Sequence, residues 1–171
     1  VYGITLGMSV TQIGLFFSVQ EGATMILKPL GGRLGDRWGR LRVIALGMLL
    51  YGFMLPLLAR APSMAAMMVL AGVFGAAQAL VFPATTALVA NRVDPAHLGA
   101  GMGMMGALNN AAKVAGPILA GLLITQVDFA RTLQLLGLML LGGGILLLGI
   151  RSAPRLWPGF HKGMALGKVE Q

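Results

Sequence analysis

Two ionisable side chains stand in the middle of long apolar stretches of this sequence, Glu21 in one and Lys113 in another. A charged group inside a bilayer is costly, so it is by default a candidate for a functional site. A glutamate there can carry a proton, and a lysine can meet an anionic group of a solute. We therefore predict that both residues border a transport pathway. The alternative is a structural pair of either residue within a helix bundle, with no role in transport.

Three neutral polar residues accompany these charges inside the apolar stretches: Gln78, Asn109 and Asn110. Asn109 and Lys113 are four residues apart, so they share one face of a helix. We predict that the three amides also belong to the pathway. Hydrogen bonding between helices, with no contact to a solute, is the competing interpretation.

The sequence lacks the residues that thiol, metal and enzyme chemistry would need. The sequence has no cysteine, which excludes disulfides, zinc ribbons and thiol catalysis. His97 and His161 lie far apart without a carboxylate cluster, so we predict no metal site, no cofactor and no enzyme activity. A lipid-modifying membrane enzyme would need clustered acids or histidines, which the connections do not supply. The net charge of +8 lies in short clusters between apolar runs, which argues against nucleic-acid binding.

The composition predicts an all-α integral membrane protein. Hydrophobic residues make up 57% and charged residues 11%, whereas soluble domains carry about a quarter charged residues. The apolar runs are about 20 residues long, the length of a spanning helix and about twice that of a barrel strand. We expect about five full transmembrane helices, preceded at Val1–Leu6 by the end of a helix whose start is missing. The predicted spans are about 10–30, 43–58, 64–89, 98–125 and 132–150.

The distribution of Lys and Arg predicts the orientation. Alternate connections carry nine of these residues on one side, including the tail, and two on the other. The positive-inside rule places the richer side in the cytoplasm. We expect a multi-pass protein of the plasma or inner membrane, with residues 151–171 forming a cytoplasmic basic tail.

The segment from Gly32 to Arg42, GRLGDRWGRLR, supplies the clearest motif. It resembles the signature of the major facilitator superfamily, in which a Gly is followed after three residues by Asp-Arg, then any residue, a Gly and two basic residues. Leu41 departs from it by standing where the second basic residue is usual. The matching positions are Gly32, Asp36, Arg37, Gly39 and Arg40. We expect a tight basic loop over 31–42, and the resemblance implies that it stabilises one state of the access cycle rather than binding solute.

A second segment, from Gly116 to Gly121, is similar to the Gly-Pro-x-x-Gly-Gly element of antiporter-type members. Ala120 replaces one of the paired glycines, and the element's usual place is the fifth helix of the family. We predict a helix kink at Gly116 and Pro117. Close packing of small residues around a proline is an equally good interpretation.

The family resemblance implies a bundle of twelve helices in two related halves. We predict that residues 1–150 form the C-terminal half, with part of helix seven followed by helices eight to twelve. The third span lacks the Arg expected in helix four, with Ala71 and Gly72 in that neighbourhood, and a basic tail follows the last span. The N-terminal half remains the alternative. The chain does not begin with Met, and we expect a fragment or a trimmed chain whose other half is missing.

The resemblance implies secondary active transport of a small solute across the lipid bilayer by alternating access. Proton-coupled efflux of drugs or metabolites is our first hypothesis, because cavities with few charges suit amphipathic solutes. Uptake of an organic anion by symport is the alternative, since Lys113 can meet a carboxylate. A scaffold or sensor that does not transport is a hypothesis of a different class.

Overall fold

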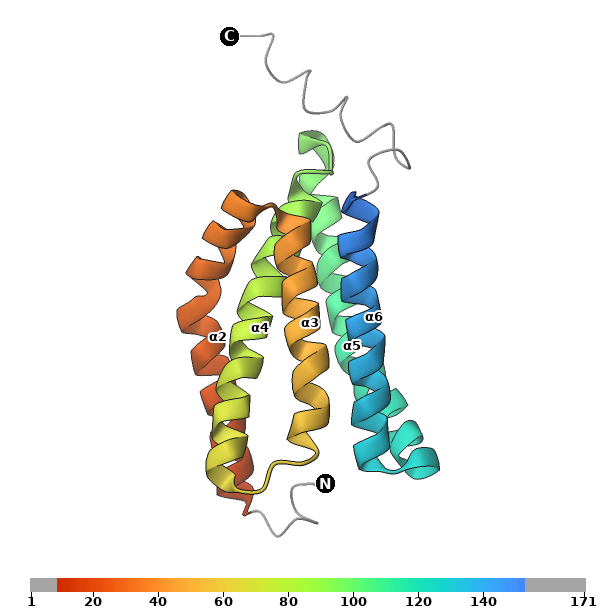
Figure 1. The fold of residues 1–171 in the computed structure, drawn as a ribbon. Coiled ribbons are helices and arrows are strands. Elements are labelled where there is room, and N and C mark those ends of the chain that lie inside the picture. The colour runs from red at the N-terminus through yellow and green to blue at the C-terminus, as the bar shows by residue number, and fades with distance from the viewer. Residues whose placement is uncertain (1–8, 153–171) are drawn as a thin grey trace.

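The computed structural model describes residues 9–152, which form a bundle of α-helices without strands (Figure 1). This confirms the predicted all-α membrane fold. The long helices are α2 (Val10–Trp38), α3 (Arg40–Leu58), α4 (Met64–Ala90), α5 (Leu98–Val127) and α6 (Phe129–Ser152), and a short 3-10 helix, η1 (Pro95–His97), precedes α5. The predicted helix end at Val1–Leu6 lies outside the described residues, as does most of the predicted tail.

Local capping fixes where the helices begin. The Ser9 side chain accepts a hydrogen bond from the backbone N–H of Gln12, and the Gln12 side chain accepts one from the backbone N–H of Ser9. This reciprocal capping box satisfies two backbone donors that the first turn of α2 leaves without helical partners. The Ser63 hydroxyl caps α4 through the N–H of Ala66, and Asp94 caps η1.

The expected loop over 31–42 is wrong, because almost all of this segment is helical. α2 continues to Trp38 and α3 begins at Arg40, so Gly39 is the single residue between the two helices. Gly39 has a φ of 91°, a region that only glycine enters without strain. Arg and Leu are good helix formers, and the polarity of this segment therefore marks the edge of the bilayer rather than the end of a helix.

Four of the described helical segments are long and apolar enough to cross a membrane, namely Arg40–Leu58, Met64–Ala90, Pro95–Val127 and Phe129–Gly149. α2 has 29 residues, which is also enough, but polar side chains in its middle, such as Gln20 and Glu21, lower its hydropathy. It runs along α4 for much of the bundle (Figure 1).

Close approach of backbones holds the helices together. α2 packs on α4, and α3 packs between α4 and α6. At Gly75 of α4 an added Cβ would collide with the Gln20 carbonyl and lie 2.8 Å from the Ala23 Cβ. Gly52 of α3 and Gly137 of α6 face each other in the same way, since a Cβ on either would lie 2.7 Å from the other's carbonyl oxygen. Small residues at these positions give the van der Waals contact that drives helix association in lipid.

α5 is the exception in this bundle. None of its 30 residues is buried, and it touches α4 and α6 only lightly. The helix is continuous through Gly116 and Pro117, both of which are exposed. Its faces are therefore open to groups outside the part of the chain that the structure describes.

Candidate functional site

A pocket of about 500 Å³ opens between the helices of the bundle. Four helices contribute to it: α2, α3, α4 and α5. Its lining residues are Gln20, Tyr51, Gln78, Val81, Phe82, Thr85, Met105 and Asn109. The volume falls within the range of about 300–1,000 Å³ that is usual for small-molecule sites.

The pocket presents neutral polar groups beside apolar ones. Gln20, Gln78 and Asn109 supply amides, and Tyr51 and Thr85 supply hydroxyls. No Asp, Glu, Lys or Arg of the described residues lines it. A group bound here would therefore meet hydrogen-bonding partners but no counter-ion within the lining itself.

One hydrogen bond crosses the pocket wall between α2 and α4. The Gln20 side chain donates through Nε2 to Oε1 of Gln78, over 3.3 Å. One turn further along α2, the buried Thr24 hydroxyl lies 2.8 Å from the Gln20 carbonyl and 3.1 Å from the Gly75 carbonyl of α4. These contacts fix the register of α2 against α4 at the place where both helices line the pocket.

The five predicted pathway residues divide into two groups. Gln78 and Asn109 line the pocket together. Glu21, Asn110 and Lys113 do not line it, and all three are exposed. Glu21 and Asn110 each follow a lining residue directly, and consecutive residues of an α-helix point about 100° apart. Lys113 lies one turn beyond Asn109, on the same side of α5.

Sequence reasoning missed several lining residues. Tyr51 and Thr85 are common residue types within membrane helices and carried no signal of their own. Gln78, Phe82 and Thr85 are four and three residues apart, so they lie on one face of α4. A helical projection drawn from Gln78 would therefore have pointed to the other two residues. Tyr51 also packs edge-to-face on Phe74, with ring centroids 5.2 Å apart.

A cation lies close to the pocket without lining it. The Lys28 ammonium is 5.7 Å from the centre of the Phe82 ring, within the range of a cation–π contact. Lys28 is exposed and belongs to the part of α2 that approaches the basic end.

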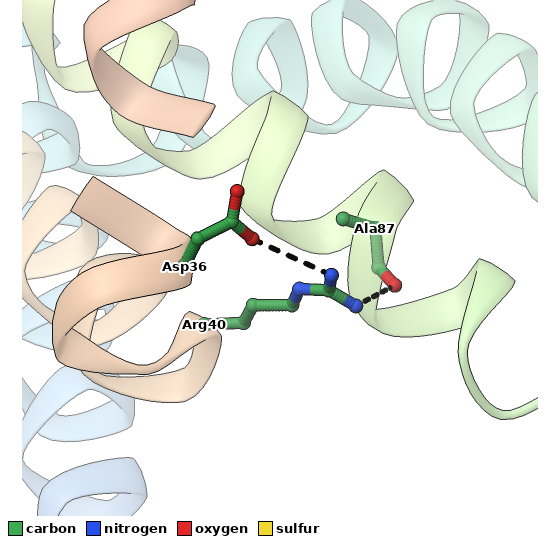
Figure 2. A network of polar contacts seen from close by, with 3 residues as sticks. All are labelled: Asp36, Arg40 and Ala87. Atoms are coloured by element: carbon green, nitrogen blue, oxygen red, sulfur yellow. Dashed lines mark hydrogen bonds and ion pairs between the residues drawn. The ribbon is translucent and has the colours of Figure 1, made fainter. Parts of the chain in front are cut away.

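The signature residues form a polar contact at the start of α3. Arg40 Nη2 lies 3.5 Å from Oδ1 of Asp36, and Arg40 Nη1 donates to the Ala87 carbonyl near the end of α4 (Figure 2). Only 23% of the Arg40 side chain is exposed, against 71% for Asp36. Arg40 thus ties the α2–α3 junction to the carbonyl end of α4, where a cation is favoured.

The other signature positions play different parts. Gly39 makes the turn described above, and Arg37 is exposed. An added Cβ at Gly32 would meet nothing within 4 Å, so packing among the described residues does not require glycine there.

Comparisons with known proteins agree with this architecture. The sequence model of the Major Facilitator Superfamily matches residues 1–168. The quinolone resistance protein NorA of Staphylococcus aureus strain MRSA252 is 30% identical over 122 residues, which are 71% of this chain and 31% of that protein. The puromycin resistance protein pur8 of Streptomyces alboniger is 33% identical over 154 residues, which are 88% of this chain and 29% of that protein. The chain thus spans less than a third of the length of these relatives. The match over nearly its whole length, on a bundle of apolar helices, shows that the chain belongs to the major facilitator superfamily of membrane transporters.

Proposed function

We propose that this chain forms one wall of the solute pathway in a secondary active transporter that works by alternating access. The observation that carries the proposal is the pocket lined from α2, α3, α4 and α5. Gln20, Gln78 and Asn109 lie well inside their helices, at a distance from both ends. Transporters of this kind bind solute near the middle of the bilayer, between two related helical units.

The solute is a small amphipathic molecule, and the direction is efflux. Two relatives are named for resistance to quinolones and to puromycin. Both are molecules that combine aromatic rings with polar groups, which suits a pocket of neutral amides and hydroxyls beside Phe82 and Met105. Uptake of an organic anion is the second candidate. It is favoured by Lys113, which lies one turn from Asn109, although Lys113 is not a lining residue.

Proton coupling is assigned to Glu21 and Lys113. Glu21 is exposed on α2 and Lys113 is exposed on α5, so neither is enclosed by the described helices. A carboxylate at this depth needs a partner or a proton, and protonation can be linked to movement of the helix that carries it. Asn110, also exposed on α5, belongs to the same open surface.

The partner of these open faces is the other half of the transporter. We assign this chain to the C-terminal half, with the N-terminal half as the missing partner. On this assignment the fragment does not transport alone, because the pathway lies between the two halves.

The signature contact acts in the conformational cycle. Arg40 links the α2–α3 junction to the end of α4, and the Asp36 carboxylate forms an ion pair with the Arg40 guanidinium. The carboxylate is largely exposed and can exchange this partner for another as helices move. Gly116 and Pro117 are proposed as the position at which α5 bends during the same cycle.

The basic ends of the helices face the cytoplasm in this proposal. The α2–α3 junction, the α4–α5 connection and the end of α6 all lie at the same end of the bundle (Figure 1). Together with the sequence that follows α6, these connections hold nine of the thirteen Lys and Arg residues. The C-terminus is then cytoplasmic, in the plasma membrane.

Flux through the complete transporter, reconstituted in proteoliposomes, tests the function. An imposed pH gradient should drive puromycin or a quinolone across the membrane, and Glu21→Gln should uncouple this flux from the gradient. Gln12→Glu, in the first turn of α2, exchanges the same two residue types in the opposite direction and keeps the capping-box acceptor, so it should leave coupling intact. Gradient-driven flux of unchanged rate in Glu21→Gln would remove Glu21 from the coupling mechanism, and absence of any flux in the parent protein would refute transport.

A further inference from the structure

The chemistry of the pocket identifies the part of the solute that it binds. We propose that the pocket is specific for an uncharged aromatic carboxamide or lactam group, held by the Gln20–Gln78 pair against Phe82. This inference rests on the proposed function only for its cellular role, because the binding chemistry follows from the lining itself.

The Gln20–Gln78 pair leaves an acceptor on Gln20 and donors on both amides without a partner in the pair. The bond from Gln20 Nε2 to Gln78 Oε1 uses a hydrogen of one amide and the oxygen of the other. Gln20 Oε1 remains as an acceptor, and the Gln78 Nε2 hydrogens remain as donors. Two linked amides thus offer adjacent acceptor and donor functions, which complement the N–H and C=O of a third amide.

The remaining polar groups of the pocket are also neutral. The Thr85 hydroxyl already donates to the Val81 carbonyl over 2.8 Å, so it is available to a ligand as an acceptor. Within residues 9–152, the side chains of Tyr51 and Asn109 make no hydrogen bond, so both are free to meet a ligand. No charged side chain joins them in the lining.

Charged head groups fit this arrangement poorly. A carboxylate has no N–H for Gln20 Oε1, and an ammonium has no acceptor for Gln78 Nε2. Either ion would also lose water without gaining a counter-ion in the lining, which is costly. A carboxamide keeps both hydrogen bonds and carries no charge.

The apolar side of the pocket suits a flat ring. Val81, Phe82 and Met105 lie among the lining residues, and aromatic rings stack or meet edge-to-face with favourable geometry. Lys28 lies 5.7 Å from the Phe82 ring centre. This cation disfavours a second positive charge on the ligand and attracts a carboxylate, so the preference for the amide over the acid depends on the Gln20–Gln78 pair alone.

Binding of three matched probes to the complete purified transporter tests the proposal: 2-naphthamide, 2-naphthoate and 2-naphthylmethylammonium. They share the ring system and differ in the polar group. We expect the amide to bind about tenfold or more tightly than either ion, since roughly 1.4 kcal/mol separates a satisfied from an unsatisfied polar pair.

Gln78→Leu should weaken 2-naphthamide binding about tenfold and 2-naphthoate binding less, because it removes the donor that both probes can use and also the acceptor that orients Gln20 Oε1 toward the amide N–H. Gln134→Leu is the matched control, since Gln134 lies on α6 outside the pocket, and it should bind all three probes as the parent does. Gln78→Glu supplies a second variant: it should favour 2-naphthylmethylammonium over the amide. Thermal melting of each variant establishes that it is folded.

Three results would overturn the proposal: equal affinity for the amide and the acid in the parent, an unchanged amide affinity in both Gln78 variants, or an equal loss in Gln134→Leu. The outcome is separable from that of the transport proposal. Gradient-driven flux without preference for the amide would refute the pocket chemistry alone. Selective amide binding without flux of any solute would refute transport alone.

Discussion

α4 and α5 are both long apolar helices with a proline inside, yet they occupy the bundle in opposite ways. α4 has 27 residues, of which six are buried, and it packs against α2 and α3. α5 has 30 residues, none of them buried. Length and hydropathy therefore do not decide which membrane helix is enclosed.

The difference lies in where the small residues find partners. Gly75 of α4 meets the backbone of α2, whereas Gly99, Gly103 and Gly106 of α5 have nothing within 4 Å of an added Cβ. Glycine thus permits close contact between α4 and α2, whereas these three glycines of α5 face no neighbour among the described residues. This contrast supports the proposal that α5 packs against a partner outside the described residues.

The largest expected effect comes from one substitution made in both helices. Gly75→Ala should destabilise the complete transporter by about 1–3 kcal/mol or more, because the new methyl collides with the Gln20 carbonyl and the Ala23 methyl. Gly103→Ala should cost less, because an added Cβ there meets nothing within 4 Å among the described residues and alanine has the higher helix propensity. Thermal unfolding in detergent measures both. Equal losses would show that α5 is as closely packed as α4.

Arg40→Gln should have the second largest effect. It removes a charge-assisted hydrogen bond to the end of α4, for which a cost of about 1.5–3 kcal/mol is typical. Arg42→Gln, on an exposed residue of the same helix, is the control and should change stability by about 0.5 kcal/mol or less. The same unfolding measurement applies. If Arg42→Gln costs as much, the basic charge of the segment matters rather than the contact with Ala87.

Thr24→Val should cost about 1 kcal/mol, because it removes the buried hydroxyl that bonds to the Gly75 carbonyl while keeping the side-chain volume. Thr125→Val on α5 is the matched change, since the Thr125 hydroxyl bonds only to the Leu122 carbonyl of its own helix and is exposed. Proteolysis of the native protein, or urea unfolding, compares the two variants. A larger loss in Thr125→Val would contradict the contrast between α4 and α5.

The smallest expected effect on stability is that of Asp36→Asn. The ion pair with Arg40 is 3.5 Å long and its carboxylate is 71% exposed, so at most about 1 kcal/mol depends on it. If the signature acts in the conformational cycle, the rate of flux should fall well beyond this change in stability. A rate that falls only in proportion to the folded fraction would assign Asp36 a structural role.

Much of the fold could be predicted from the sequence, because apolar runs of spanning length dominate it. The exception is residues 31–42, where the polar residues predict a loop but the structure has helix on both sides of Gly39. α2 leaves the apolar region before it stops, and only Gly39 interrupts the helical backbone. Polarity reports the surroundings of a segment, whereas a helix end depends on backbone conformation.

The site could be predicted only in part. Gln78 and Asn109 stood out because an amide among apolar residues is unusual, and both line the pocket. Glu21 and Lys113 stood out for the same reason but do not line it, since polarity does not reveal the direction of a side chain. Tyr51 came from α3, and its inclusion depends on how α3 packs beside α4, which no local pattern contains.

Chemical labelling of Gln78→Cys tests the central claim, that this chain supplies the wall of an alternating pathway, most directly. The chain has no cysteine of its own, so the background is clean once cysteines elsewhere in the complete transporter are replaced. Met139→Cys, on the exposed surface of α6, is the lipid-facing control. We predict that a membrane-impermeant maleimide labels Gln78→Cys from either side, that solute at about ten times the concentration needed for the parent protects it, and that Met139→Cys stays unlabelled. Labelling of Gln78→Cys from one side only, or without protection by solute, would contradict the account.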